Sequence, residues 1–217
     1  MADQQKTVGS PGSHGGEGRP RLVLASASPR RLQLLAQIGV IPDLVVPADL
    51  DETPHPAEKP RLYARRMAYE KALKIASLHP DDWVLGADSV VSVGRRILPK
   101  ALDAATAAQC LALLSGRRHR VRTGVALLGP DGKVRIRVVE TVVAFKSLSR
   151  EECQAYLASK DWHGKAGGYG IQGLAAAFVR HLSGSYSNVV GLPLYELAQM
   201  LQGQGVKVMK GWTSDHG

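Results

Sequence analysis

Short apolar-rich runs alternate along the chain with segments whose apolar positions recur every three or four residues. The apolar runs predict strands at 21–26 ("RLVLAS"), 43–48 ("DLVVPA"), 83–91 ("WVLGADSVV"), 123–129 ("TGVALLG"), 134–145 ("VRIRVVETVVAF") and 174–182 ("LAAAFVRHL"). The helical periodicity predicts helices near 29–39, 58–78, 103–114, 149–159 and 193–203. This alternation of strands and helices predicts an α/β domain built in layers.

The segment "LGPDGKV" at 128–134 carries a Pro-Asp-Gly turn between two predicted strands. Such a turn joins neighbouring antiparallel strands, so the sheet is expected to be mixed and to contain at least one hairpin. Residues 1–20 are rich in Gly, Ser and Pro and lack an apolar run, which predicts a disordered tail. One domain is therefore expected over 21–206, followed by a second tail at 207–217.

The composition shows an excess of positively charged residues. The 217 residues include 28 Lys and Arg against 19 Asp and Glu, a formal net charge of +9, which favours nucleotides, nucleic acid or an acidic surface as partners. Cys110 and Cys153 follow no metal-ligand spacing, so neither a disulfide framework nor a zinc site is expected, and a reducing cytoplasm is favoured. No segment is long and apolar enough to span a bilayer, so no membrane contact is expected.

The stretch "SASPRR" at 26–31 places two cations at the start of a predicted helix. Ser28 suits the N-cap and Pro29 the first turn. Arg30 and Arg31 there oppose the helix dipole, at a cost of up to about 1 kcal/mol for each charge. Solvated surface arginines are one interpretation. A bound phosphate, held by backbone amides, serine hydroxyls and both guanidiniums, is favoured because it reverses that cost.

Asp88 and Ser89 interrupt the otherwise apolar run "WVLGADSVVSV" at 83–93. A buried, unpaired carboxylate is costly, so either a cation compensates Asp88 or the strand ends there at a cleft. Both alternatives suit an enzyme that handles phosphates, in which Mg²⁺ or Mn²⁺ holds the phosphates while Asp88 orients or deprotonates a water. A structural Asp satisfied by neighbouring amides is the alternative.

Lys71 falls on the apolar arc of the helix predicted from the repeat over 60–78. Its neighbours on that arc are Ala64, Met67, Ala68, Ile75 and Leu78. An inward lysine either extends its ammonium group out of the core or contacts an anion. The candidate anions are a phosphate and a buried carboxylate such as Asp88.

The segment "GKAGGYGIQG" at 164–173 contains the pattern GxGxxG, but not in the context of a dinucleotide-binding turn. A polar stretch precedes it and a predicted strand follows it, whereas that motif needs a strand before and a helix after. The glycines still permit a close approach of backbone to a ligand. Gln172 can donate to and accept from a base edge, and Lys165 adds a cation.

Five segments occur in the order seen in Maf-like proteins, and the chain resembles that family from about Leu22 to Leu201. They are "SASPRR", "GADSVV", "SGRRHRVRTGVAL", "KAGGYGIQG" and "GSYSNVVGLPL". The resemblance implies a nucleoside triphosphate pyrophosphatase that uses a divalent metal, Mg²⁺ or Mn²⁺, to release a monophosphate and pyrophosphate. It also implies the elongated α/β fold of inosine triphosphate pyrophosphatases, with a mixed central sheet flanked by helices, and a homodimer.

The resemblance also assigns roles to residues. It implies that Asp88 activates the attacking water and that Glu52 and Asp88 hold metal. The positions implied to bind substrate are Ser28, Arg30, Arg31, Lys71, Ser89, Lys100, Lys165 and Gln172. Two positions depart from the family pattern: Ser89 stands where threonine is usual, and Ala101 follows Lys100 where proline is usual.

Base preference is implied by the same motifs. Arginine after "SASP" and the string "YGIQG" resemble the group that acts on dTTP and UTP, with Arg30, Ser89 and Gln172 at the positions implied to set the preference. The group acting on 7-methyl-GTP, the first alternative, typically has an aromatic residue in place of Arg30. A second alternative is a protein that binds nucleic acid or the division machinery. It is disfavoured, and no nucleic acid partner is expected, because the chain lacks an aromatic-basic stacking pattern.

Overall fold

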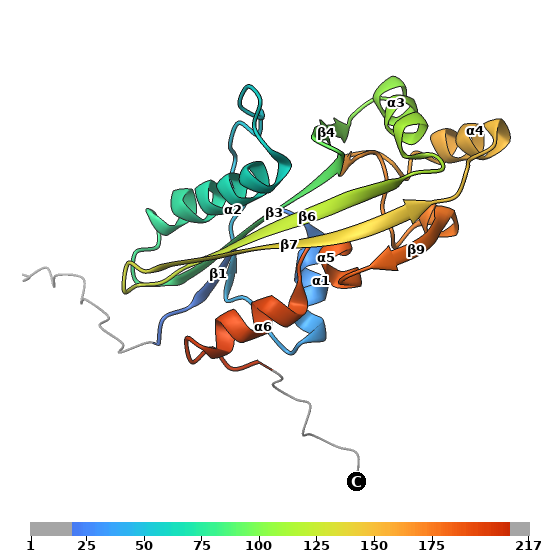
Figure 1. Ribbon diagram of the computed structural model, residues 1–217. Coiled ribbons are helices and arrows are strands. Elements are labelled where there is room, and N and C mark those ends of the chain that lie inside the picture. The colour runs from blue at the N-terminus through green and yellow to red at the C-terminus, as the bar shows by residue number, and fades with distance from the viewer. Residues whose placement is uncertain (1–18, 209–217) are drawn as a thin grey trace, which may run out of the picture.

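A computed structural model describes residues 19–208. Of the two predicted tails, everything except Arg19, Pro20, Lys207 and Val208 lies outside the described residues. Within the described part, a seven-stranded sheet forms the centre of the molecule (Figure 1). In spatial order its strands are β2 (Leu44–Val45), β1 (Leu22–Ala25), β3 (Trp83–Val93), β6 (Arg118–Leu128), β7 (Val134–Phe145) and β9 (Val179–Ser183), with β4 (Arg96–Leu98) paired to the end of β3.

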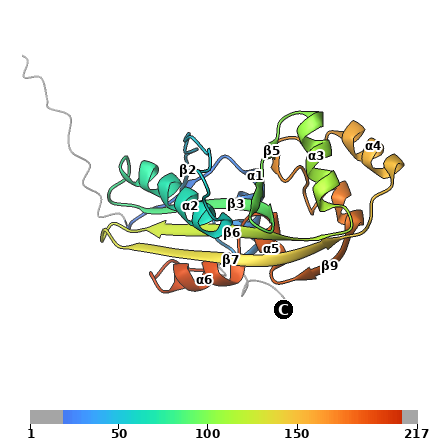
Figure 2. The same ribbon diagram turned by 45° about the horizontal axis from the view of Figure 1, so that its top comes forward.

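The predicted mixed sheet is confirmed. β1 pairs in parallel with β2 and β3, whereas β3, β6, β7 and β9 pair in antiparallel fashion. The Pro-Asp-Gly turn joins β6 to β7, as predicted, with Gly132 in the left-handed region at φ 69° and its amide donating to the Gly129 carbonyl. Because β3, β6 and β7 have 11 or 12 residues each, the sheet is drawn out along their length and the molecule is elongated (Figure 2).

Helices cover both faces of the sheet (Figures 1 and 2). They are α1 (Pro29–Gln37), α2 (Pro60–Ala76), α3 (Ala104–Leu114), α4 (Arg150–Ser159), α5 (Tyr186–Val190) and α6 (Leu194–Gln202). α2 packs on one face, where Ala68, Ala72 and Ile75 meet Val84 and Ala126. The opposite face carries the larger core, which includes Leu35 of α1 and Leu197 of α6. The predicted layers of an α/β domain are therefore confirmed.

A two-stranded sheet, β5 (Lys100–Ala101) and β8 (Lys165–Ala166), joins the helical end of the molecule to its centre. α3 and α4 lie at that end (Figure 1). Both helices begin with side-chain caps: Asp103 accepts from the Thr106 amide, and Ser149 and Glu152 form a capping box. The strand pair brings Lys100 and Lys165, from distant parts of the sequence, onto neighbouring backbone segments.

Some predicted elements need correction. The strand predicted over 174–182 is a 3-10 helix at Leu174–Phe178 followed by β9, because the buried positions Ala175 and Phe178 are three apart, the 3-10 period. β6 begins at Arg118, before the predicted 123, since arginines alternate with the buried His119 and Val121. α2 ends at Ala76, which leaves Leu78 exposed instead of on the buried arc. α5, β4, β5 and β8 are short elements that the periodicity did not predict.

Glycines on two neighbouring strands let α2 rest directly on the sheet backbone. A Cβ built on Gly124 of β6 lies 2.1 Å from the Ala64 carbonyl oxygen, and one on Gly86 of β3 lies 2.3 Å from the Ala68 carbonyl oxygen. Gly124 is also the register partner of Asp88 on β3. The close approach therefore fixes α2, and the side chains on its inner face, against the centre of β3.

We expect Gly124→Ala to lower the free energy of unfolding by about 3 kcal/mol, because the added methyl group must push α2 off the sheet. Urea denaturation followed by circular dichroism measures the change. Gly203→Ala is the matched control: Gly203 is exposed, has φ −62°, and its added Cβ approaches backbone no closer than 3.3 Å. Equal stability of Gly124→Ala and wild type would show that α2 does not depend on this contact.

Candidate active site

A cavity of about 610 Å³ opens where β1 passes into α1, beside the centre of β3. Its opposite walls come from the glycine-rich segment 164–173 and from the end of α5. The charged side chains that line it are Arg30, Arg31, Lys71, Asp88, Lys100, Asp161 and Lys165. Of the predicted substrate-binding residues, Ser28, Ser89 and Gln172 line it as well. The predicted residues therefore come together around one cavity, except Glu52, which reaches it through Lys71 and Lys100.

Lys71 joins two carboxylates at the floor of this cavity. Its Nζ lies 2.6 Å from Asp88 Oδ1 and 2.7 Å from Glu52 Oε1. Lys71 is 6% exposed and Asp88 4% exposed, so the pair is buried. The contact with a buried carboxylate, one of the alternatives for Lys71, is present, and β3 continues through Asp88 instead of ending there.

Lys100 extends the charge chain toward solvent, since its Nζ contacts the second oxygen of Glu52. Burial alone would raise the pKa of Glu52, but the hydrogen bonds from Lys100 and Lys71 outweigh it and hold that pKa below its ordinary value. Glu52 is thus ionised at neutral pH. The four groups alternate in sign along the line Lys100, Glu52, Lys71 and Asp88.

Arg31 is held at the rim by two hydrogen bonds. Its Nε donates to the Gly191 carbonyl at 3.1 Å, and its terminal nitrogen donates to Ser26 Oγ at 2.9 Å. Burial lowers the pKa of the Arg31 guanidinium although the Asp88 carboxylate nearby raises it. A cation in this situation lacks a full anionic partner, which a phosphate supplies.

The start of α1 also presents polar groups to the cavity. Ser28 occupies the N-cap position, as predicted, but its side chain makes no cap hydrogen bond and faces the cavity together with Arg30. Pro29 carries no amide proton, and the Arg31 and Leu32 amides donate to the Ser28 carbonyl at 3.1 and 3.5 Å, so Arg30 supplies the remaining amide of the first turn. An anion at this point would accept from that amide and from the Arg30 guanidinium.

The glycine-rich wall is tied together by Asp161, a residue that sequence reasoning missed. Asp161 Oδ1 lies 3.0 Å from Lys165 Nζ, and Oδ2 accepts from the Leu174 amide at 3.0 Å. One carboxylate thus orients Lys165 and closes the loop that carries the exposed Gln172. The i, i+4 spacing of Asp161 and Lys165 is the one sequence signal that could have identified this pair.

The same wall rests on a buried aromatic cluster. Tyr169, which lines the cavity, shares a 2.8 Å hydrogen bond between its hydroxyl and His119 Nε2. The His119 ring packs edge-on against Phe145 at 5.0 Å and Tyr169 at 5.3 Å between ring centroids. Burial lowers the pKa of His119 from 6.5 to about 4, so the imidazole is neutral at physiological pH.

The donors present fit a divalent metal shared with a bound phosphate. Asp88 and Glu52 place two carboxylates on either side of one ammonium group. Mg²⁺ commonly takes one or two carboxylates and completes its shell with phosphate oxygens and water. Within residues 19–208 no group of three or more His, Cys, Asp and Glu gathers as an all-protein metal cage.

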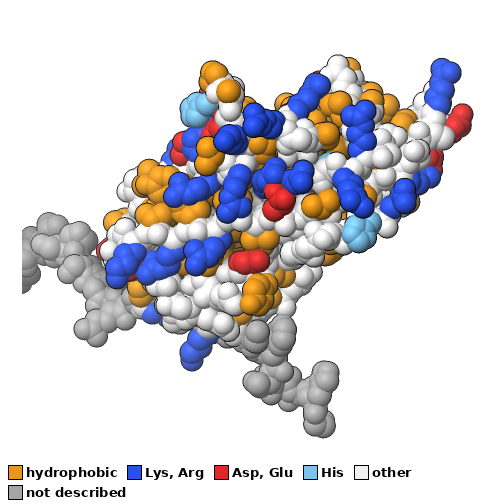
Figure 3. All heavy atoms as spheres, in the orientation of Figure 1, with side chains coloured by type: hydrophobic (Ala, Val, Ile, Leu, Met, Phe, Trp, Pro, Cys, Tyr) orange, Lys and Arg blue, Asp and Glu red, His pale blue; other side chains and the backbone are white. Residues whose placement is uncertain are grey.

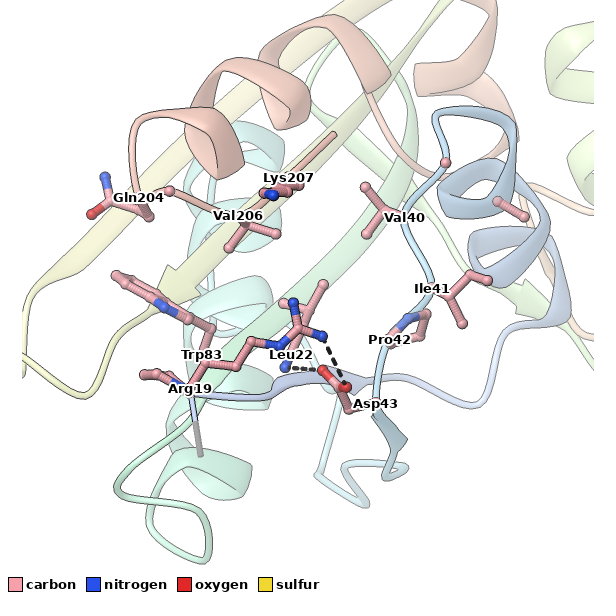
Figure 4. Close-up of a pocket in the computed structure, with 14 residues that line it drawn as sticks. Arg19, Leu22, Val40, Ile41, Pro42, Asp43, Trp83, Gln204, Val206 and Lys207 are labelled. Atoms are coloured by element: carbon pink, nitrogen blue, oxygen red, sulfur yellow. Dashed lines mark hydrogen bonds and ion pairs between the residues drawn. The ribbon is translucent and has the colours of Figure 1, made fainter. Parts of the chain in front are cut away.

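Two further cavities are lined by partly or wholly different residues. One of about 380 Å³ adjoins the first, with which it shares Asp88, Ser89, Lys100 and Ala166 as lining residues. Another of about 620 Å³ lies between the start of β1 and the segment after α6 (Figure 4). There Asp43 accepts from the Leu22 amide at 2.7 Å and pairs with Arg19 at 3.9 Å, contacts that attach the entering chain to the sheet.

A layered α/β sheet whose strand ends and helix start surround a cavity of cations and carboxylates is typical of proteins that bind nucleotide phosphates. The family model described as "Maf-like protein" matches residues 21–204, and this chain belongs to the Maf-like family.

The chain is similar to curated proteins along most of its length. The chain is 61% identical over 188 residues to a protein of Caulobacter vibrioides (87% of this chain, 97% of the relative) and 62% identical over 184 residues to one of Paramagnetospirillum magneticum (85% and 97%). It is 58% identical over 209 residues to one of Gluconobacter oxydans (94% and 96%). Each of the three is named dTTP/UTP pyrophosphatase.

Among solved structures, the HAM1 protein of Coxiella burnetii is similar over part of the chain. The sequences are 17% identical, the TM-score is 0.41, and the match covers 60% of this chain and 75% of that chain.

The neutral, buried His119 predicts a stability that depends on pH. Its folded pKa of about 4 lies below its ordinary 6.5, so the unfolded chain binds the extra proton between these values. The stabilisation is complete above pH 6.5 and is lost as the pH falls toward 4, by up to about 3 kcal/mol. Urea unfolding at pH 7.5 and 4.5 measures the loss, which we expect to shrink in His119→Gln and to persist in the exposed control His181→Gln. Equal losses in both variants would contradict the assignment.

Proposed function

We propose that this protein is a nucleoside triphosphate pyrophosphatase that hydrolyses dTTP and UTP to the monophosphate and pyrophosphate. The observation that carries the proposal is the buried Lys71 between Glu52 and Asp88, at the floor of a cavity lined with further cations. The names of the relatives at 58–62% identity support the same activity.

Cations on different sides of the cavity bind different phosphates of the triphosphate. Arg30, Arg31 and the start of α1 form one side of the cavity, and Lys165 lies on the glycine-rich side. Phosphates bound between these sides approach Lys71 at the floor and Lys100 nearer to solvent. Most of the rate acceleration then comes from neutralising the charge of the phosphates and holding the reacting groups in line.

Asp88 is placed to handle the water. Its Oδ1 is occupied by Lys71, which leaves Oδ2 to accept a proton. Water oxygen attacks the α phosphorus, the bridging bond from the α phosphorus to the oxygen on the β phosphorus breaks, and pyrophosphate leaves. The proton lost by the water goes to Asp88, and the α phosphate stays on the nucleoside.

Glu52 and Asp88 are the residues that would hold a divalent metal, Mg²⁺ or Mn²⁺, whose positive charge offsets that of the phosphate oxygens. Lys71 occupies the place between the same two carboxylates in the protein alone. Its ammonium group holds both carboxylates in position before substrate arrives.

The exposed Gln172 and the half-buried Ser89 line the cavity and supply neutral hydrogen-bonding groups for the base. Hydrolysis of 7-methyl-GTP is the first alternative. The relatives cited are named for dTTP and UTP, which favours the pyrimidine substrates.

Binding to nucleic acid or the division machinery is the second alternative. Lys and Arg side chains gather on the face shown in Figure 3. Arg120 and Arg122 of β6 are already paired with Glu140 of β7, at 3.0 and 2.6 Å, which reduces the charge they offer to a polyanion.

The absence of a nucleic acid partner stays a prediction, as do the homodimer and the cytoplasmic location. Within residues 19–208, no helix has the length and apolar character that crossing a membrane requires.

A product assay on a nucleotide panel tests the function. The panel contains dTTP, UTP, CTP, modified pyrimidine triphosphates and 7-methyl-GTP, each with Mg²⁺ and with Mn²⁺. We expect monophosphate and pyrophosphate in equal amounts, fastest from dTTP and UTP. Release of orthophosphate instead would contradict cleavage between the α and β phosphates.

In the same assay, Asp88→Asn removes the proton acceptor, and we expect turnover to fall at least about a hundredfold. The fold should persist because Lys71 keeps its contact with Glu52. Circular dichroism checks the fold. A folded variant that retains more than a tenth of wild-type turnover would remove Asp88 from the proposed role.

Gln172→Ala tests the part of the cavity that we propose to bind the nucleotide base. We expect it to change the ratio of kcat/KM for UTP to that for purine triphosphates by about tenfold, because one oriented amide is lost, with kcat for UTP less affected. The substitution is exposed and should leave the melting temperature unchanged. Unchanged ratios across the panel would show that Gln172 does not contact the base.

A further inference from the structure

A chain of hydrogen bonds connects Ser89 to α5 through Thr123. Ser89 Oγ is 2.8 Å from Thr123 Oγ1, its register partner on β6. Thr123 Oγ1 in turn donates to the Asn188 carbonyl of α5 at 2.9 Å. Thr123 and Asn188 are both 0% exposed, so water does not take part.

The direction of the first bond follows from the second. A hydroxyl carries one proton, and a carbonyl oxygen only accepts. Thr123 gives its proton to the Asn188 carbonyl, because leaving that carbonyl buried and unpaired is unfavourable. Thr123 can then only accept from Ser89, so the Ser89 proton points away from the cavity.

We propose that Thr123 is a specificity-determining positioning residue that presents Ser89 to the substrate purely as a hydrogen-bond acceptor. This inference rests on the proposed function. An acceptor needs a donor on the ligand, and the imide N3–H of uracil and thymine is such a donor. Cytosine carries an unprotonated N3, whose lone pair faces the Ser89 oxygen unfavourably. Thr123 itself does not line the cavity; it acts through Ser89.

Thr123→Val tests the proposal because it keeps the side-chain shape and removes the hydroxyl. The Ser89 proton is then released to turn into the cavity, where it meets the N3 lone pair of cytosine and opposes the N3–H of uracil. We expect the ratio of kcat/KM for UTP to kcat/KM for CTP to fall about tenfold. Thr123→Ser, which keeps the hydroxyl, should restore the wild-type ratio.

Thr141→Val is the matched control. Thr141 lies on the next strand, is 0% exposed, and also contacts the α5 region by accepting from Asn188 Nδ2 at 3.0 Å. It does not touch Ser89, so its loss should affect UTP and CTP equally. A shift of the ratio in Thr141→Val as large as that in Thr123→Val would overturn the proposal, because looser packing alone would then explain both.

A measurement on the wild-type enzyme keeps the proposal testable if Thr123→Val fails to fold. We expect 3-methyl-UTP, which lacks the imide proton, to have a kcat/KM at least about tenfold below that of UTP, and 3′-deoxy-UTP to behave like UTP. If 3′-deoxy-UTP is impaired and 3-methyl-UTP is not, the donor is the sugar hydroxyl and the assignment to the base is overturned.

The outcomes separate this inference from the proposed function. Release of no pyrophosphate from any nucleotide would defeat the function itself. Hydrolysis of UTP with an unchanged ratio in folded Thr123→Val would leave the function standing and defeat only the orientation of Ser89.

Discussion

The ammonium group of Lys71, buried between the carboxylates of Glu52 and Asp88, is the interaction on which the rest of the site depends. The buried carboxylate of Asp88 requires a cation, and the buried lysine in turn depends on the carboxylates of Asp88 and Glu52. The interaction also joins three separate parts of the chain: the loop before α2, α2 itself and the centre of β3. The charge balance at the floor of the cavity and the packing of these three parts therefore depend on the same ion pairs.

Local patterns predicted those parts of the fold that have strong periodicity. The long apolar runs predicted β3 and β7, and the Pro-Asp-Gly turn predicted the hairpin of β6 and β7. The strand predicted over 174–182 is correct only for its last part, β9, because the buried Ala175 and Phe178 are three positions apart and suit a 3-10 turn, whose first amide, that of Leu174, donates to Asp161. The pair β5 and β8 has two residues in each strand, too few for any period to appear.

For the site, sequence predicted the charged residues and missed those that orient them. Lys71 stood out because it breaks an apolar arc, and Asp88 because it breaks an apolar strand. Asp161 and Thr123 look ordinary in sequence, since a surface-type aspartate and a strand threonine are both common. Their importance comes from contacts with Lys165 and Ser89, across four and 34 positions of the chain.

The seating of α2 on Gly86 and Gly124 has a consequence for how the cavity adapts to ligands of different size. The wall that bears Lys71 cannot retreat, because the helix already touches the sheet backbone. The opposite wall contains Gly167 and Gly168, with φ of 66° and 67°, and Gly170, whose Cβ would collide with Lys165. A Cβ on Gly167 would lie 2.8 Å from Val91 Cγ1, so this wall is closely packed as well, and neither wall has room to move apart for a larger ligand.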